Sequence, residues 1–478
     1  MNAFDLSGVT VVDTNDGSLR PGMTVVVEDG KIAHVAPAES VGASTRRSID
    51  AAGTFVTPGF IECHAHPLNS SDPAGYLTMM LAHGITGVRQ MSGTPEHLAA
   101  RRAGTLIPAA DAPELLEMPG EILTRANAGN PQRIVEEINR QQAAGADFIK
   151  VIEVDPATFF AGLGECNRLG LRYIGHLPPE IDIREAATRG MRSVEHLGPR
   201  DTQVLACSTA EPELREAMRT REAPPSHLSG PIPEHVIRRA IANPVLLTQP
   251  GEFVRYRRVI DTYSDAKCRE LAAFLAGTGM WQVPTLIRIR TMQLADDRTY
   301  CDDPNLQYVP AAIRQMWAEL TDQFQAKLSD EIRALLKELF ALQIGMVKPL
   351  YDAGVNMMAG SDTGGGWIIP GVGLHREFDL LAEAGLSPLE ILQLTTRNAA
   401  KFLGRETMMG SVEEGKNADL VLLAANPLAD VANLHKVTGV VRAGTYYSDA
   451  DLAALKQRTA DRQHTLTPSP EALKPPCC

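Results

Sequence analysis

The chain has 478 residues, of which 44% are hydrophobic and 22% are charged. This length exceeds one minimal domain, and the composition is typical of a globular protein and excludes a disordered or collagen-like chain. The formal net charge of −12 repels phosphate backbones, so we expect no nucleic-acid partner. No basic segment followed by an apolar one opens the sequence, and no apolar run approaches the roughly 18 residues of a membrane span. We therefore expect a cytoplasmic protein without a membrane partner.

The seven cysteines show no Cys-x-x-Cys spacing. This pattern predicts reduced, buried thiols and disfavours a structural zinc cluster. Cys477 and Cys478 follow two prolines, and we expect them on an exposed tail where they are prone to oxidation. Their pattern indicates no function.

Alternating apolar and polar residues predict strands near both ends of the chain. Segments 9–12 and 23–30 alternate in this way, and Asp29-Gly30 is typical of a tight hairpin turn. A similar pattern returns in segments 419–423 and 437–444. We predict one small β domain built from residues 1–56 and 405–460, followed by a tail at 461–478.

The middle of the chain alternates short apolar segments with helical ones, which is typical of buried parallel strands with crossover helices. The eight predicted strands lie near residues 55–64, 84–91, 115–118, 146–153, 171–176, 191–196, 280–286 and 355–362. Eight such units predict an α/β fold with a (β/α)₈ TIM-type barrel at residues 57–404. This span exceeds the about 250 residues of a typical barrel, so we expect helical insertions at about 198–279 and 287–353 that cover the mouth of the barrel.

Two helices carry clear start signals. Ser329 precedes a helical apolar pattern, as an N-cap does. Ser387-Pro388-Leu-Glu390 combines an N-cap, a first-turn proline and a capping-box glutamate. Gly404 provides a stop signal, so we predict the last barrel helix between these points.

Four of the twelve histidines lie at the end of a predicted barrel strand, where barrel enzymes carry their active sites. His64 and His66 are two residues apart, a spacing that places both side chains on one side of an extended strand. His176 and His196 end two later strands, and Asp362 ends the last one, before a glycine-rich segment. Imidazole and carboxylate groups are common ligands of divalent ions. The pattern therefore predicts a metal site.

Lys150 ends the fourth predicted strand and points to the same edge. An ammonium group cannot bind a metal ion, so this lysine is either repelled by the cluster or chemically modified. Each residue alone has an ordinary explanation: a surface lysine, a partly buried histidine, a helix-capping aspartate. The joint pattern over strands one, four, five, six and eight arises by chance far less easily.

These residues stand in motifs that resemble the amidohydrolase superfamily, in the branch of the prolidases and imidazolonepropionase-like proteins. The resemblance extends over nearly the whole chain. The motifs are Pro58-Gly-Phe-Ile-Glu-Cys-His-Ala-His66, Phe148-Ile-Lys150, Gly175-His176-Leu-Pro178, Val194-Glu-His196-Leu, Gly360-Ser-Asp362 and the segment 410–421.

The resemblance implies a binuclear metal centre. In that superfamily the fourth-strand lysine is carbamylated by CO₂ and bridges two divalent ions. By this likeness His64, His66 and Asp362 hold the more buried ion, His176 and His196 the more exposed one, and Lys150 both. We expect Zn²⁺, with Co²⁺, Mn²⁺ or Fe²⁺ as alternatives.

The expected reaction is hydrolysis of an amide C–N bond in a small molecule such as a dipeptide or an N-acyl amino acid. A hydroxide shared by the two ions attacks the carbonyl, and Asp362 acts as the catalytic acid and base. Urea, carbamate and lactone substrates stay open. A mononuclear deaminase or cyclic-amide hydrolase and a metal-binding scaffold without turnover are the alternative functions. A homo-oligomer stays open as well.

The substrate contacts are less well marked. Arg89 follows the second strand and could bind a substrate carboxylate, with a structural ion pair as the alternative. His375 could contact substrate or cap a helix. The chain also departs from the family pattern, because Pro178 stands where many prolidase-like members have a tyrosine or histidine. Segment 101–121 departs from the usual glycine-rich pattern of the third strand.

Overall fold

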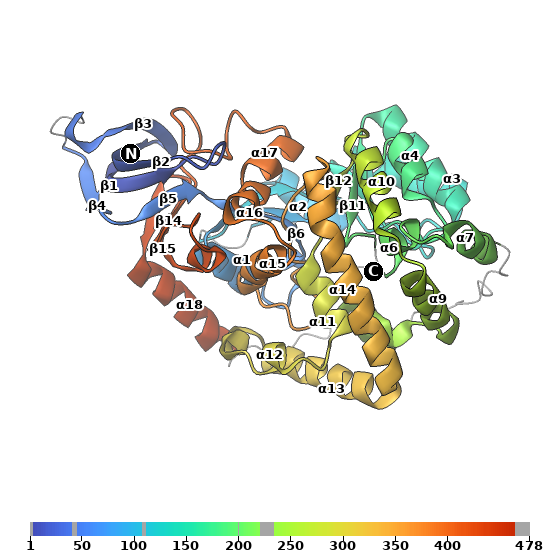
Figure 1. Ribbon diagram of the computed structural model, residues 1–478. Helices are drawn as coiled ribbons and strands as arrows, with labels where there is room; N and C mark the ends of the chain where they lie inside the picture. Colours follow the sequence, from blue (N-terminus) through green and yellow to red (C-terminus); the bar gives the residue numbers. More distant parts are fainter. Residues whose placement is uncertain (1–2, 41–44, 108–110, 199, 220–233, 464–478) are drawn as a thin grey trace.

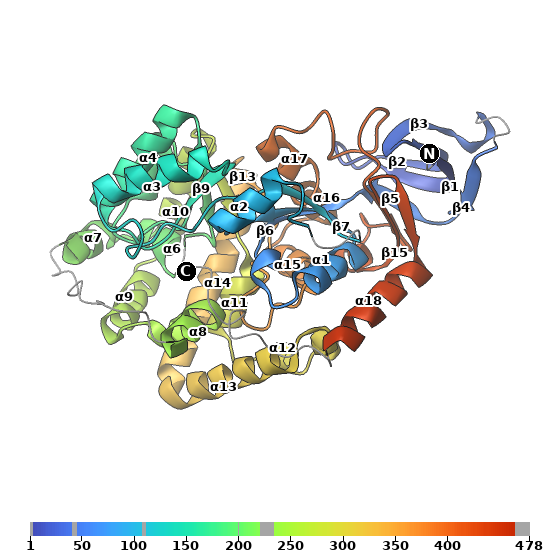
Figure 2. The ribbon, with the colours of Figure 1, turned by 180° about the vertical axis from the view of Figure 1, so that it is seen from behind.

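The computed structural model describes residues 3–40, 45–107, 111–198, 200–219 and 234–463. The chain has an α/β fold with parallel sheets. A sheet built from both ends of the sequence lies at one end of the molecule, and helices surround parallel strands in the remainder (Figures 1 and 2). The predicted Cys477 and Cys478 tail lies outside the described residues.

The sheet at the end of the molecule confirms that the two terminal segments fold together. Its strands run in the order β16-β15-β14-β5-β1-β2-β3, with β4 beside β1. They are β1 (Phe4–Val12), β2 (Leu19–Glu28), β3 (Lys31–Pro37), β4 (Arg47–Asp50), β5 (Phe55–Pro58), β14 (Leu420–Leu423), β15 (Val437–Arg442) and β16 (Thr445–Ser448). Asp29 and Gly30 form the expected turn, with φ of 49° and 77°. The exact domain boundaries stay a prediction.

Eight parallel strands follow the predicted order. They are β6 (Phe60–Ala65), β7 (Ile85–Gln90), β8 (Glu114–Glu117), β9 (Phe148–Val151), β10 (Arg172–Gly175), β11 (Ser193–Glu195), β12 (Trp281–Val283) and β13 (Asn356–Met357). They pair as a sheet β6-β7-β8 and a sheet β13-β12-β11-β10-β9, and not as one closed cylinder. Backbone bonds nevertheless join the sheets at both edges.

At one edge the N–H of Leu123 donates to the carbonyl of Lys150 at 2.9 Å. At the other, the N–H of Cys63 donates to the carbonyl of Ala359 at 3.1 Å. The carboxyl ends of all eight strands therefore meet at one face, although strand pairing is interrupted twice.

The first predicted strand is in fact two strands that belong to different sheets. β5 ends at Pro58 and β6 begins at Phe60, so Gly59 separates them. A side chain on Gly59 would collide with Thr86, whose Oγ1 lies 2.0 Å from the position of a Cβ. This close approach lets the chain leave the end sheet and enter the parallel sheet within one residue.

The described parts of the segments 198–279 and 287–353 are mainly helical. The helices of the chain are α1 (Pro73–Ala82), α2 (Pro95–Arg102), α3 (Pro131–Ala143), α4 (Pro156–Leu169), α5 (Ile183–Thr188), α6 (Thr202–Ala206), α7 (Glu211–Arg219), α8 (Glu234–Ala242), α9 (Pro250–Asp261), α10 (Asp265–Ala276), α11 (Leu286–Gln293), α12 (Arg298–Cys301), α13 (Ala311–Lys327), α14 (Asp330–Asp352), α15 (Val372–Glu383), α16 (Pro388–Leu394), α17 (Arg397–Leu403) and α18 (Asp449–Gln463). Ser329 caps α14 by accepting from the N–H of Ile332, which confirms that signal.

The last predicted helix is interrupted. Ser387 and Glu390 form the predicted capping box of α16, and Gly404 ends α17 with φ of 67°. Between them Thr395 accepts from the N–H of Ile61 through its carbonyl at 2.8 Å. Its hydroxyl also donates to the carbonyl of Ile61 at 3.1 Å. Because Thr395 pairs with β6, the helix breaks there.

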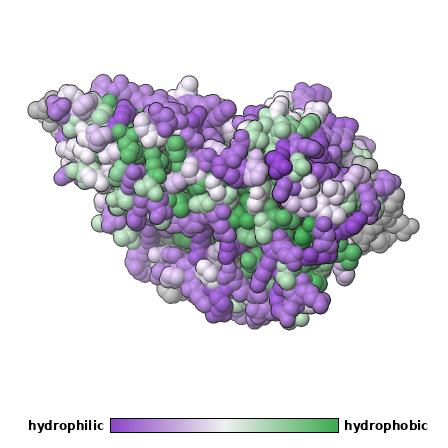
Figure 3. All heavy atoms as spheres, viewed as in Figure 1, coloured by the Kyte–Doolittle hydropathy of each residue, from purple (hydrophilic) through white to green (hydrophobic). Residues whose placement is uncertain are grey.

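The surface is that of an ordinary globular protein. Hydrophilic residues dominate the lower rim, where α12 and α13 lie, and hydrophobic residues show mainly in a central band (Figure 3). No described helix is both long and apolar enough to cross a membrane. Cys63, Cys166, Cys207 and Cys268 are buried free thiols, as expected.

Candidate metal centre

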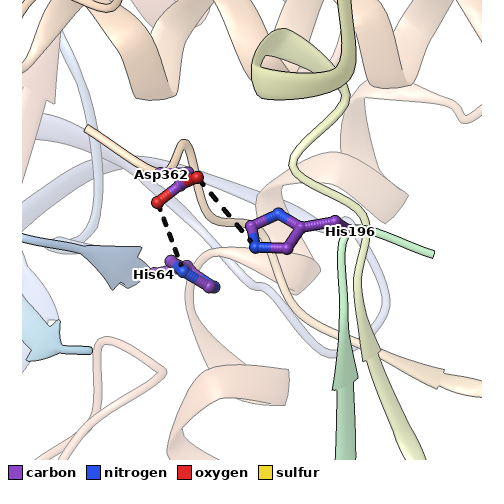
Figure 4. Close-up of side chains that lie close together, drawn as sticks. All are labelled: His64, His196 and Asp362. Atoms are coloured by element: carbon purple, nitrogen blue, oxygen red, sulfur yellow. Dashed lines mark ion pairs between the residues drawn. The ribbon is translucent and has the colours of Figure 1, made fainter. Parts of the chain in front are cut away.

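The candidate ligands converge at the carboxyl ends of the parallel strands. His64 lies within β6 and His66 follows it. His196 follows β11 directly, and Asp362 lies on the loop after β13. Figure 4 shows His64, His196 and Asp362 pointing toward one another from these three elements.

Asp362 lies at the centre of the cluster. Its Oδ1 is 3.3 Å from Nε2 of His64 and 3.3 Å from Nε2 of His66. Its Oδ2 is 4.0 Å from Nε2 of His196. Donor atoms of His64, His196 and Asp362 all lie within 4.8 Å of one another. Two imidazoles and one carboxylate at this separation form a donor set that fits a divalent ion.

Three of the histidines are held by their other ring nitrogen. Nδ1 of His64 donates to Oε2 of Glu195 at 2.6 Å. Nδ1 of His66 lies 2.7 Å from Ser92 Oγ, and Nδ1 of His196 lies 2.5 Å from Thr285 Oγ1. Such contacts fix ring orientation and tautomer in metal sites. They leave each Nε2 facing Asp362.

Burial favours the neutral form of His66, His176 and His196, which is the form that metal ligation requires. It lowers the pKa of His66 to about 4. Burial also lowers the pKa values of His176 and His196 well below their usual range. Burial by itself would raise the pKa of Asp362, but His64 and its other basic neighbours hold that pKa well below its usual range. The site therefore combines three neutral imidazoles, those of His66, His176 and His196, with an ionised carboxylate.

Lys150 is buried inside the same cluster and is not a surface lysine. Its side chain comes from β9, and the residue is 2% exposed. Its Nζ lies 3.0 Å from Nε2 of His64. Because Nδ1 of His64 carries the proton given to Glu195, Nε2 accepts from the ammonium group. The lysine therefore reaches the nitrogen that a metal ion would bind.

His176 completes the set of predicted ligands. It follows β10, and its ring centre lies 4.9 Å from that of His196. The centre of the His196 ring lies in turn 4.7 Å from that of His64. The structure thus brings all six predicted ligands to one face, on strands or loops distant in sequence.

Backbone strain gathers at this face. Among the described residues, nine that are not glycine have φ between 43° and 65°, and seven follow the strands β9, β11, β12 and β13. His196 at 60°, Thr285 at 45° and Asp362 at 57° belong to this group. Such conformations cost roughly 1–3 kcal/mol each and cluster at functional sites.

The two predicted substrate contacts lie elsewhere. Arg89 is 0% exposed, and its Nη2 donates to Oε1 of Glu195 at 3.4 Å. His375 is buried in α15, where Nε2 donates to the carbonyl of His83 at 2.8 Å. A substrate can reach neither side chain in this structure. Arg89 is therefore better explained as a buried ion pair, and His375 as a structural residue.

Pro178 is buried and has no side-chain donor. It cannot polarise a carbonyl group, as the departure from the family pattern had suggested. Sequence reasoning also missed four residues that contact the candidate ligands: Ser92, Glu195, Thr285 and Arg288. Glu195 directly precedes His196, and that adjacency was a usable signal. Thr285 and Arg288 follow β12, a strand that carried no candidate.

Parts of the chain resemble known proteins in sequence. Residues 311–446 match the model of the Amidohydrolase family. This match includes Asp362 and α15 but not His64, His66, His176 or His196. An 80-residue segment is 38% identical to adenine deaminase of Paracoccus denitrificans, covering 16% of this chain and 13% of that protein. A 100-residue segment is 37% identical to imidazolonepropionase of Salinispora arenicola, covering 20% and 24%.

The chain thus aligns with less than a quarter of each of these two relatives. Likeness in fold is far more extensive. The bottromycin amidohydrolase has a TM-score of 0.70 at 20% identity, covering 97% of this chain and 91% of that one. A Xaa-Pro dipeptidase with bound methionine has a TM-score of 0.62 at 15% identity, covering 93% and 100%. Residues 311–446 therefore resemble the Amidohydrolase family, and the chain as a whole shares the fold of these two solved structures.

Proposed function

We propose that this protein is a metal-dependent hydrolase that cleaves an amide C–N bond in a small molecule, such as a dipeptide or an N-acyl amino acid. The observation that carries the proposal is the position of Lys150. Its Nζ is buried 3.0 Å from Nε2 of His64, within the His and Asp cluster. The prolidase-like neighbours in fold favour this substrate class.

Two divalent ions would be held by His64, His66 and Asp362 on one side and by His176 and His196 on the other. Lys150, carbamylated by CO₂, would hold both. Zn²⁺ suits this mixture of nitrogen and oxygen donors, with Co²⁺, Mn²⁺ or Fe²⁺ as alternatives. Metal ions supply an activated water at neutral pH and polarise a carbonyl group.

The proton chemistry belongs to Asp362. Oδ1 faces His64 and His66, whereas Oδ2 lies 4.0 Å from Nε2 of His196 and 3.1 Å from Nε of Arg288, and Oδ2 is the oxygen that we assign to proton transfer. Asp362 takes a proton from the attacking water and passes it to the leaving nitrogen. The buried surroundings exclude bulk water, which strengthens the electrostatic interactions of this carboxylate.

The proposal includes the (β/α)₈ barrel itself. Hydrogen bonds at both edges of the two parallel sheets, and the convergence of the ligands on one face, support treating the sheets as one functional barrel. The N- and C-terminal sheet would then act as a separate structural domain at residues 1–56 and 405–460.

A mononuclear deaminase is the second candidate. Lys150 would then stay unmodified, and the adenine deaminase relative points to the same chemistry. In this case His64, His196 and Asp362 would suffice for one ion. The number of ions therefore separates the two candidates.

The deciding experiment measures the metal content of protein loaded with Zn²⁺ or Co²⁺ in bicarbonate. We expect two ions per chain, and one in Lys150→Met. The loaded wild type is then incubated with dipeptides, N-acyl amino acids and adenine, and products are detected by mass spectrometry. Hydrolysis with two ions supports the proposal, and adenine deamination with one ion favours the alternative. Full loading without turnover of any compound would contradict both and indicate a metal-binding scaffold.

A further inference from the structure

Arg288 connects the candidate metal site to an inserted helix. It lies in the first turn of α11, after β12, and is only 6% exposed. Its Nε lies 3.1 Å from Oδ2 of Asp362. The contact binds the carboxylate oxygen that does not face His64 and His66.

The other end of the guanidinium group holds α8. Nη1 donates to the carbonyl of Ala242 at 3.0 Å, and Nη2 donates to the carbonyl of Ile241 at 2.5 Å. These are the last residues of α8, whose carbonyls have no partner within the helix and carry partial negative charge. The carbonyl of Ala242 also accepts from the N–H of Gly366 at 3.3 Å. The end of α8 thus rests on the loop that carries Asp362.

We propose that Arg288 is a positioning residue that makes the orientation of the Asp362 carboxylate depend on the docking of α8. Three donors of one rigid fork bind one side chain and two consecutive carbonyls. A lysine has a single nitrogen and cannot make these contacts at once. Asp362 also has φ of 57°, a strained conformation that persists only where its surroundings hold it. The inference rests on the proposed function only in taking Asp362 as a metal ligand.

Gly365 offers an independent way to disturb this link. A Cβ at Gly365 would lie 2.5 Å from Nη1 of Arg288 and 2.9 Å from its Cδ. The backbone of Gly365 is not left-handed, so alanine there tests space alone. Gly365→Ala should displace the guanidinium while its charge is retained.

Two substitutions serve as matched controls. Arg290 lies in the same helix but pairs with Asp297 at 3.1 Å and with Glu383 at 3.5 Å, away from Asp362. Arg290→Lys therefore controls for Arg288→Lys. A Cβ at Gly345 in α14 would have open space around it, with no contact within 4 Å, so Gly345→Ala controls for Gly365→Ala.

The test measures Co²⁺ affinity by chelator competition and hydrogen exchange of peptides covering α8. We expect Arg288→Lys and Gly365→Ala each to weaken metal binding by roughly 10–100-fold, the usual effect of losing a partner of a metal ligand. Both should also speed exchange in α8. The double variant should add little, because both changes break one link. Neither control should alter either quantity.

Wild-type metal affinity in both Arg288→Lys and Gly365→Ala would overturn the proposal. So would weaker binding with unchanged exchange in α8, which would reduce Arg288 to a local neighbour of Asp362. A wild type that binds metal but hydrolyses nothing contradicts the proposed function alone, since affinity and exchange still decide the role of Arg288. A wild type that binds no metal overturns both.

Discussion

Oε2 of Glu195 lies 2.6 Å from Nδ1 of His64, and both side chains are fully buried. The other oxygen, Oε1, accepts from Nη2 of Arg89 at 3.4 Å and from the Ser193 hydroxyl at 3.0 Å. Although burial opposes ionisation, His64 and Arg89 hold the pKa of Glu195 at about 2. One carboxylate therefore orients a candidate ligand and neutralises a buried guanidinium group.

Replacing Glu195 should affect both binding and stability. Glu195→Gln removes the charge that fixes the His64 tautomer, so we expect metal affinity to fall by roughly 10–100-fold. Arg89 keeps its longer contact with Oε2 of Glu117, at 3.9 Å, so we expect a loss of unfolding free energy of at most the about 3–5 kcal/mol of a fully broken buried pair. Chelator competition and urea denaturation measure the two effects. Glu185→Gln, which breaks an exposed pair with Arg189, is the control, and wild-type metal affinity in Glu195→Gln would count against the orienting role.

Gly360 tests how closely the loop before Asp362 approaches β6. A Cβ at Gly360 would lie 2.8 Å from both the Cβ and the backbone nitrogen of His64. Because the backbone cannot yield easily, Gly360→Ala should displace His64 and lower metal content at a fixed metal concentration by about 10-fold or more. Atomic absorption after desalting measures this. Gly345→Ala is the control, and an unchanged metal content would show that the loop can move.

Asp362 is expected to transfer protons as well as to bind metal. Asp362→Asn, assayed at a metal concentration that saturates the site, should lower kcat by about 10²–10⁴-fold. KM should change less, because the lost interaction forms mainly in the transition state. Asp352→Asn at the exposed end of α14 is the control. Near-normal kcat with the metal fully bound would refute the acid–base role.

Glu377 should make stability depend on pH. Burial raises its pKa from 4.5 to about 8. Between these values the folded state keeps a proton that the unfolded state releases, so stability falls as pH rises, by up to about 1.4 kcal/mol per unit. The contribution is fully present below 4.5 and is lost as the pH passes about 8.

Glu377→Gln should flatten this dependence. Urea denaturation measures the unfolding free energy at pH 5 and pH 8. From the lower to the higher pH, the value for the variant should rise relative to that of the wild type by about 2–4 kcal/mol. Glu383→Gln, on the exposed side of the same helix, should show the same pH dependence of the unfolding free energy as the wild type. Parallel curves for Glu377→Gln and the wild type would mean that Glu377 is ionised when buried.

The strands and the positions of the candidate ligands were predictable because they depend on local patterns. Short apolar runs mark buried strands, and a polar residue at the end of such a run lies at the carboxyl edge of the sheet. Lys150 and Asp362 were found in this way. The supporting contacts were not, because Thr285 and Arg288 approach their partners through a loop whose conformation depends on tertiary packing, with φ of 45° at Thr285.

Arg89 is a second residue whose role could not be predicted from the local sequence. The sequence placed it at the end of a predicted strand, which was compatible with a substrate contact, and the structure places it within β7. Whether its side chain points to the mouth or the interior depends on partners distant in sequence. Cys63 and Glu195 supply those partners, at 3.2 Å and 3.4 Å. Likewise, nothing local in the sequence around Thr395 indicates that it pairs with Ile61 and interrupts the last helix.

The pairing of β5 with β14 has a consequence for how the protein folds. Val56 lies opposite Leu422 in this antiparallel pair, so the ring of chain that it closes includes every candidate ligand. Bringing the ends of so long a loop together costs conformational entropy before the two strands can pair. This cost slows folding. During synthesis β5 emerges from the ribosome long before β14, so the edge of β5 that pairs with β14 stays exposed until then. The nascent chain is therefore most vulnerable to aggregation just before residues 420–423 are synthesised.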